Sequence, residues 1–346
     1  MKRTKPILIS LVILTAIIIT GCFDNVESDD RVSGKYPGED TPADSARLFS
    51  PGFINTGMIT RDVAVMPEMD EFYFCVSTLG YRYASIMYTK KVDGYWTKPA
   101  LAPHMEDLLY INFEPCISSD GKKFFFLSSR PDPANNKDGG NQDIWVMERK
   151  GDTWDEPYNL GEPVSTNAQE YFPSVTREGT LYFTRQEEDA NYIYRSKYIN
   201  GRYHEPERLP SQINCGQNRF NAFISPDEDY IIVPAAGMEG STGGSTDYYI
   251  VFRDNNDNWS EPLNMGEKIN SESNLEFSAY ISPDKEALFF MSARLVNPDS
   301  IYSLIPDGNI MDLYNMPETG NSNIYWIKSD IIEDLRQKAV FTNKEE

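Results

Sequence analysis

Acidic residues that could act as a catalytic pair stand at the beginning of repeated apolar segments. Asp62 and Glu114 align with Asn221 and Ser278 in other segments, while Glu170, Arg219 and Glu276 lie two residues before the aligned position. Two carboxylates about 5 to 9.5 Å apart across a glycosidic bond are what a glycoside hydrolase needs. These side chains are therefore candidates for sugar chemistry, or for a polar site that binds a ligand without reacting with it.

Arginines form a second group of candidates. Arg130, Arg185 and Arg294 each follow an apolar run, and Arg219 precedes Asn221. A guanidinium presents donors in a fixed fork, which suits recognition of a glycan, a peptide or the loop of a partner protein. The same arginines could instead pair with acidic neighbours and hold adjacent parts of the fold in register. The sequence leaves both interpretations open.

Other common sources of chemistry are missing from the sequence. The two histidines, His104 and His204, are far apart, so we expect neither a metal site nor a cofactor. Neither a Gly-x-Ser-x-Gly motif nor a Walker-type loop occurs. After Cys22 the chain has Cys75, Cys116 and Cys215, an odd number that argues against a disulfide framework. Buried free thiols and a Cys75–Cys116 bridge are both compatible with the sequence.

The elements that must position these residues come from a repeated phrase, an aromatic residue followed three residues later by proline. Its copies are Trp96–Pro99, Trp154–Pro157, Tyr203–Pro206 and Trp259–Pro262. The steps of 58, 49 and 56 residues are typical of a repeated supersecondary unit. Each unit divides into four short strands separated by turn signals such as Asp120-Gly121. The second strands are apolar on consecutive residues, which predicts burial on both faces.

These units predict an all-β fold, a β-propeller of five four-stranded blades over residues 44–330, with six blades as an alternative. Sheets that pack face to face around an axis bury both faces of each blade. The fifth unit lacks its fourth strand, and the segment 48–56 aligns with the fourth strand of the unit before it, at 263–271. We therefore expect an N-terminal strand to close the ring by pairing residues near 48 with residues near 325. Residues 331–346 should form a short C-terminal helix, with Ser329 before it, and a tail.

Several short motifs support this interpretation. They are Ser-Pro-Asp at 225–227 and 282–284, Ser-Asp-Gly at 119–121, Ser-Ser-Arg at 128–130, Asp-Ile-Trp at 143–145 and Trp-x-x-Pro-x-Asn-Leu-Gly at 154–161. With them the chain resembles the TolB-like, WD-repeat-like propellers of bacterial envelopes over about residues 45 to 330. The resemblance implies a binding or scaffold role and no particular ligand. The chain departs from this family in having five units where six blades are common.

The N-terminus indicates export. A basic start, the apolar stretch 7–19 and Thr20-Gly21-Cys22 resemble a bacterial lipoprotein signal, in which Cys22 carries the lipid. An ordinary signal peptide or membrane anchor is the alternative. Residues 22–43, rich in acidic residues, glycine and proline, should form a flexible tether. Phe23 after the cysteine favours the outer membrane if the cell is Gram-negative, by resemblance to enterobacterial sorting.

Charge narrows the possible partners. The net charge of −21 becomes about −24 without the three basic residues of the leader, which disfavours nucleic acid. We expect a monomeric, lipid-anchored envelope module that binds a protein partner or a saccharide through its loop-rich face, near Asp62, Glu114, Arg130, Glu170, Arg185, Arg219, Asn221, Glu276 and Arg294. A glycoside hydrolase-like enzyme with axial carboxylates is the alternative, and a purely structural spacer is a third possibility.

Overall fold

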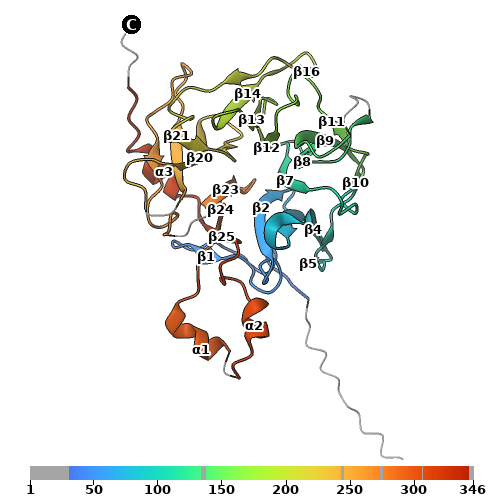
Figure 1. Ribbon diagram of the computed structural model, residues 1–346, viewed down its shortest axis with the longest axis vertical. Coiled ribbons are helices and arrows are strands. Elements are labelled where there is room, and N and C mark those ends of the chain that lie inside the picture. Colours follow the sequence, from blue (N-terminus) through green and yellow to red (C-terminus); the bar gives the residue numbers. More distant parts are fainter. Residues whose placement is uncertain (1–30, 134–137, 243–244, 273–275, 306, 343–346) are drawn as a thin grey trace, which may run out of the picture. The chain divides into compact units, whose positions relative to one another are not determined.

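The computed structural model describes residues 31–133, 138–242, 245–272, 276–305 and 307–342. The chain divides into two compact units, residues 1–31 and 32–346. Almost all of the first unit, including Cys22, lies outside the described residues, so the lipidation site stays a prediction. The second unit is a five-bladed β-propeller, as the repeats predicted, and five antiparallel sheets surround its axis (Figure 1).

Each blade runs from an inner strand at the axis to an outer strand. The first blade contains β2 (Ile59–Val65), β3 (Glu71–Ser77), β4 (Ala84–Val92), β5 (Tyr95–Trp96) and β6 (Ala100–Leu101). The second contains β7 (Asn112–Ile117), β8 (Lys123–Ser128), β9 (Asp143–Lys150), β10 (Thr153–Trp154) and β11 (Tyr158–Asn159). The third contains β12 (Glu170–Val175), β13 (Leu181–Gln186), β14 (Asn191–Ser196) and β17 (Glu207–Arg208), with the ribbon β15 (Tyr198–Ile199) and β16 (Arg202–Tyr203) beyond β14.

The last two blades follow the same plan. The fourth contains β18 (Asn218–Arg219), β19 (Phe223–Ile224), β20 (Tyr230–Ala236), β21 (Asp247–Phe252) and β22 (Leu263–Asn264). The fifth contains β23 (Glu276–Ile281), β24 (Ala287–Ser292), β25 (Asn323–Lys328) and β1 (Arg47–Leu48). Short helical turns lie at η1 (Leu79–Tyr81), η3 (Pro298–Ser300), α1 (Ile301–Leu304), α2 (Ile310–Tyr314) and α3 (Ile331–Arg336).

The antiparallel order gives the ring two different faces. Hairpin turns between first and second strands, at 66–70, 118–122, 176–180, 225–229 and 282–286, lie on one side, which we call the turn face. Loops between second and third strands, and the connections between blades, lie on the other side, the loop-rich face. The longest of these loops, residues 293–322, carries α1 and α2 and extends away from the blades at the bottom of Figure 1.

The ring closes as predicted. β1 pairs with β25 so that Leu48 lies opposite Tyr325 and Arg47 opposite Trp326. The Asn55 amide fixes this seam, because its nitrogen donates to the Ile324 carbonyl at 2.9 Å while its oxygen accepts from the Ile324 amide at 2.9 Å. An N-terminal strand therefore completes the last blade and covers the open edge of β25.

Residues 32–36 form a second closure, which we call the strap. At one end Trp96 of the first blade donates its amide to the Val32 carbonyl at 2.7 Å. At the other end the Tyr36 hydroxyl donates to Asp284 of the fifth blade at 2.9 Å, and its ring packs edge-on against Trp326. The side chain of Tyr36 is fully buried. Residues 32–36 of the predicted tether, 22–43, thus contact the first and fifth blades, where the side chain of Tyr36 is buried in the seam.

Second strands are buried on both faces, as their uninterrupted apolar runs predicted. In β8, Phe124 and Phe126 pack toward the first blade, whereas Phe125 packs toward the third. All three rings are essentially inaccessible to solvent. Burial of a large side chain contributes about 1.5–3 kcal/mol. This alternation makes each blade part of two hydrophobic cores.

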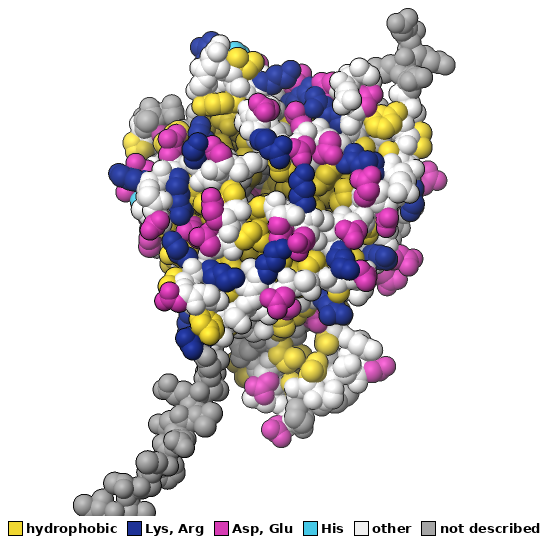
Figure 2. Space-filling view, turned by 180° about the vertical axis from the view of Figure 1, so that it is seen from behind, with side chains coloured by type: hydrophobic (Ala, Val, Ile, Leu, Met, Phe, Trp, Pro, Cys, Tyr) yellow, Lys and Arg dark blue, Asp and Glu magenta, His cyan; other side chains and the backbone are white. Residues whose placement is uncertain are grey.

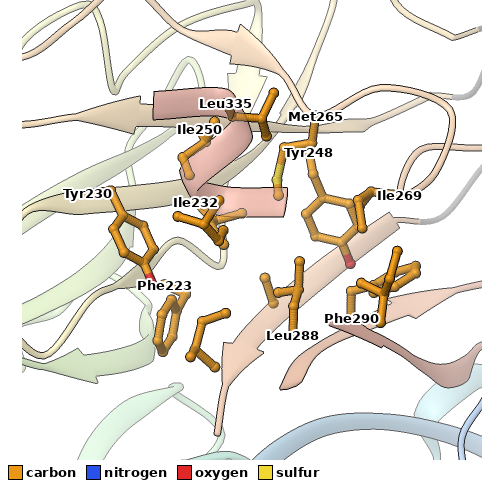
Figure 3. Packing of buried hydrophobic residues seen from close by; sticks show 14 of the residues in the cluster. Phe223, Tyr230, Ile232, Tyr248, Ile250, Met265, Ile269, Leu288, Phe290 and Leu335 are labelled. Carbon is orange, nitrogen blue, oxygen red and sulfur yellow. The ribbon is translucent and has the colours of Figure 1, made fainter. Parts of the chain in front are cut away.

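The C-terminal helix is shorter than expected and belongs to the fold. α3 begins after Asp330, not directly after Ser329, and spans six residues of the predicted 331–346. Ile332 and Leu335 are buried in the core between the fourth and fifth blades, where Leu335 lies beside Ile250 and Met265 (Figure 3). These two side chains make α3 part of the hydrophobic core of the propeller.

The surface mixes both signs of charge. Figure 2 shows one face on which Lys and Arg side chains alternate with Asp and Glu, with hydrophobic side chains between them. Among the helices of the described ranges, none combines the length and the hydrophobicity required to cross a membrane.

Candidate functional site

A left-handed residue interrupts the inner strand of every blade at the same place. The five residues and their φ values are Asp62 (52°), Glu114 (61°), Phe172 (51°), Asn221 (51°) and Ser278 (67°). In four blades the strand register shifts across this residue, which identifies a β-bulge. A non-glycine residue rarely adopts positive φ, so five equivalent occurrences mark a common backbone requirement.

The bulges free backbone amides to bond across blades. The Phe172 amide donates to Glu114 Oε2 at 2.8 Å, and the Asn221 amide donates to Thr184 Oγ1 at 3.0 Å. The Glu114 amide points to Cys75 Sγ at 3.3 Å. Each of these bonds joins neighbouring blades, so the bulges link the blades to one another near the axis.

Four of the five bulge side chains meet in one buried network around Arg61. Arg61 Nε donates to Asp62 at 3.0 Å, and its Nη2 donates to Glu114 Oε1 at 2.8 Å. Asn221 Nδ2 donates to the same Glu114 oxygen at 3.2 Å and to Ser278 Oγ at 3.1 Å. None of these side chains is more than 7% exposed. The contact between the second and fourth blades, which are not neighbours, is possible only at the axis.

Sequence reasoning missed Arg61, the centre of this network. The residues before the other four bulge positions are all aromatic, namely Phe113, Tyr171, Phe220 and Phe277. The Arg61 guanidinium lies 5.1 Å from the centre of the Phe113 ring and 4.5 Å from that of Phe277. One cation thus occupies a place that is aromatic in every other blade. An alignment of the five units by their bulges exposes that signal.

Burial controls the ionisation of Glu114. Loss of hydration raises the pKa of Glu114 to about 7, although the Arg61 guanidinium opposes the shift and Asp62 reinforces it. The titratable or charged groups that face Glu114 are Arg61, Asp62, Cys75 and Tyr171. Near neutral pH this network therefore changes charge with Glu114 as the titrating group.

The predicted arginines form three equivalent stacks away from the axial network. Arg130, Arg185 and Arg294 each lie within 5.5 Å of two ring centres, one from the second strand and one from the third strand of the blade. Each also donates to a backbone carbonyl of the connection that enters the blade, at His104, Val164 and Ile269 respectively. These contacts hold the connections in place, as the register interpretation of the arginines describes.

The remaining predicted residues also contact their own connections. Glu170 accepts from Arg185 Nε at 2.8 Å and from the Thr166 amide at 2.9 Å. Glu276 accepts from the Ser271 amide at 2.9 Å, and burial raises its pKa to about 7. The Arg219 guanidinium lies 4.4 Å from the centre of the Tyr192 ring and donates to the Cys215 carbonyl. Glu170, Glu276 and Arg219 thus do not join the Arg61 network.

A cavity lies on the other side of the network from the side on which a site was expected. A cavity of about 510 Å³ runs from Asp62 and Ser278 toward the turn face, lined by inner strands of all five blades and by α3. On the loop-rich side the axis is occupied by Arg61 and its aromatic neighbours. The sequence predicted an open polar site at the axis on the loop-rich face. The structure has a buried network there, with a cavity on its turn-face side, because the bulge turns these side chains inward.

The network offers little to a hydrolytic mechanism. Both Glu114 oxygens already accept hydrogen bonds, from Arg61 and Asn221 and from the Phe172 amide. Cys75, Cys116 and Cys215 are free thiols, so the Cys75–Cys116 bridge is absent. Within the described residues, no three His, Cys, Asp or Glu side chains gather as metal ligands would.

Comparison with known proteins identifies the fold and no closer relationship. No protein-family model matches the chain, and no curated protein matches it. A solved structure described as a glycoside hydrolase is 10% identical, with 84% of this chain and 92% of that chain covered, at a TM-score of 0.50. TolB from Acinetobacter baumannii is 16% identical over 78% of this chain, at a TM-score of 0.43.

A third similar structure is the hydrazine synthase of Kuenenia stuttgartiensis. It is 13% identical over 66% of this chain and 36% of its own length, at a TM-score of 0.41. The present chain spans 54% of TolB, about half its length. At these identities the likeness concerns the propeller fold alone. Membership of the TolB-like family stays a prediction.

Proposed function

We propose that this protein is a lipid-anchored module of the cell envelope that binds a protein partner through its loop-rich face. The observation that carries the proposal is the distribution of exposed hydrophobic side chains. Among the described residues fifteen large ones are exposed, and ten of these belong to the loop-rich face. The ten are Met58, Leu79, Tyr83, Leu108, Leu109, Leu295, Leu304, Ile310, Met311 and Tyr314.

These ten side chains are concentrated on one side of the ring. They come from loops of the first and fifth blades and from the connections that flank the first blade. The hairpin turns of the turn face contribute none. Leu109 is 84% exposed and Ile310 66% exposed, and hydrophobic side chains are visible on the α1–α2 insertion at the bottom of Figure 2. Leucine, isoleucine and methionine gathered in this way suit an interface with a protein better than a sugar site.

The position of the strap favours a protein, rather than a lipid surface, as the partner of the loop-rich face. Val32 bonds Trp96 next to the turn at 93–94, and Tyr36 bonds Asp284 in a hairpin turn, so the chain enters the propeller on the turn face. Nine residues lie between Cys22 and Val32, so the reach from one to the other is about 35 Å when the chain is fully extended. An anchor at Cys22 would therefore be connected to the turn face, the side of the ring opposite the loop-rich face.

Site-specific photo-crosslinking in living cells tests the partner. A photoreactive amino acid at Leu109 or Met311 should give one discrete crosslinked product in common. The matched control is Val92, which is 49% exposed but lies on the turn face, and it should not give that product. The same product from all three positions, or none from the first two together with specific binding to a glycan array, contradicts the proposal.

The anchor has a separate test. Metabolic labelling with an alkyne fatty acid should label the wild type, and Cys22→Ser should abolish the label and release the protein from membranes. If Cys22→Ser keeps the fatty acid label, the lipid is attached to another residue. Because this result does not depend on the crosslinking, either half of the proposal can fail alone.

A further inference from the structure

The cavity beneath the axial network has walls of uniform chemistry. Each inner strand contributes one branched aliphatic residue at an equivalent position, and all five line the cavity. They are Val65, Ile117, Val175, Ile224 and Ile281. A volume of about 510 Å³ lies in the range of small-molecule sites. The walls therefore favour an apolar body of modest size.

The two ends of the cavity are polar. At the inner end lie Asp62 and Ser278, backed by Arg61 and Glu114. At the turn face Asp227 pairs with Lys285 at 2.8 Å and with Arg177, and Asp229 pairs with Arg336 of α3 at 2.7 Å. The rim cations are thus already engaged by carboxylates, which leaves them little capacity to attract an anion.

Carboxylates outnumber cations along the cavity. The acidic lining residues are Asp62, Asp227, Asp229, Asp330 and Glu333, against Arg177, Lys285 and Arg336. At the inner end Arg61 faces two carboxyl groups with a single positive charge. Asp62 Oδ2 lies 2.9 Å from Arg61 Nε, and the Asp62 side chain is buried at this end of the cavity. The excess of carboxylates over cations around the cavity favours a cationic ligand group.

We propose that this cavity binds the ammonium end of an aliphatic chain, such as an alkylamine or a lysine side chain. The ammonium group donates to Asp62 at the inner end, and the alkyl chain lies against the five aliphatic side chains. This site is independent of the loop-rich face, because it opens toward the opposite side of the ring.

Calorimetric titration of the full-length protein in nanodiscs, with empty nanodiscs subtracted, tests the site. The probes are n-pentylammonium, 1-pentanol and pentanoate, which share the alkyl chain and differ in charge. We expect pentylammonium to bind at least tenfold more tightly than either of the others. Equal affinities, or no saturable binding of pentylammonium, overturn the proposal.

Two variants locate the binding. Asp62→Asn should reduce the preference for ammonium over alcohol to less than threefold, and asparagine tolerates the positive φ at this position. Ile281→Trp fills the cavity and should abolish binding of all three probes, whereas Ile199→Trp, on an exposed ribbon, should not. If Ile281→Trp does not fold, Val175→Phe takes its place. Binding that survives both a filled cavity and Asp62→Asn refutes the assignment.

Discussion

Removal of the Arg61 guanidinium gives the sharpest test of the axial network. Arg61→Met keeps an unbranched side chain but leaves Asp62 and Glu114 buried without their cation. Loss of one partner of a buried ion pair costs about 3–5 kcal/mol. For a unit of about 315 residues this corresponds to a fall in Tm of about 5–8 °C. We expect that fall at pH 8, measured by calorimetry.

The loss of stability caused by Arg61→Met should depend on pH, and the ionisation of Glu114 determines whether it grows or shrinks as the pH rises. Its folded-state pKa of about 7 lies above its ordinary value of 4.5, so the stability contributed by the protonated form is complete below about 4.5 and lost as the pH rises through 7. At pH 5 the wild-type carboxyl is already neutral, and Arg61 then faces one charge in place of two. The destabilisation by Arg61→Met should therefore be at least 1 kcal/mol smaller at pH 5 than at pH 8.

Two further variants separate the network from a general loss of packing. Arg202→Met removes an exposed arginine and should leave Tm unchanged. The triple variant Arg61→Phe, Asp62→Asn, Glu114→Gln supplies the aromatic residue present in the other blades and neutralises both carboxyls, so it should recover most of the lost stability. A wild-type Tm for Arg61→Met at pH 8, or an equal penalty at both pH values, would refute the reasoning.

Three more outcomes follow from the structure. Tyr36→Phe should lower the free energy of unfolding by about 1–2 kcal/mol in denaturant titrations, because the hydroxyl donates to Asp284, and an unchanged midpoint would contradict the role of the strap. Glu276→Gln should reduce the loss of stability between pH 5 and pH 8, since burial raises the pKa of Glu276 to about 7 and the amide mimics its protonated form; superimposable pH curves would show otherwise. In denaturant, Ellman's reagent should titrate three thiols in a Cys22→Ser protein, whereas a single thiol would indicate a Cys75–Cys116 bridge.

The repeats allowed the blades and the closing strand to be predicted, because strand patterning and turn residues act locally. The pairing of Leu48 with Tyr325 followed from one missing strand at the end of the fifth unit. The bulge was not visible to this reasoning. β2 was expected to begin at Asp62, yet it begins at Ile59 and passes through the bulge. A single repeat contains no sequence pattern that indicates a left-handed residue within a strand. The position becomes visible when the five units are aligned.

The candidate site was harder to predict because its contacts join distant segments. Asp62, Glu114 and Asn221 were selected and do meet, but the cation that joins them was overlooked because it precedes the aligned position. Arg130 and Arg294 were selected for their charge, although their stacking partners lie on two neighbouring strands of the blade. The cavity is lined by the inner strands of all five blades, so no sequence pattern within one unit predicts it.

The strap also determines how the protein responds to mechanical load. A pull on the chain before residue 32 acts first on the bond between Val32 and Trp96, then on the Lys35 ion pair with Asp284 at 2.7 Å and on the Tyr36 hydroxyl. These contacts bridge the first and last blades, which the chain also links through residues 49–58 between β1 and β2. Tension on the N-terminus therefore acts first on the seam, and the ring should open there by release of β1 from β25.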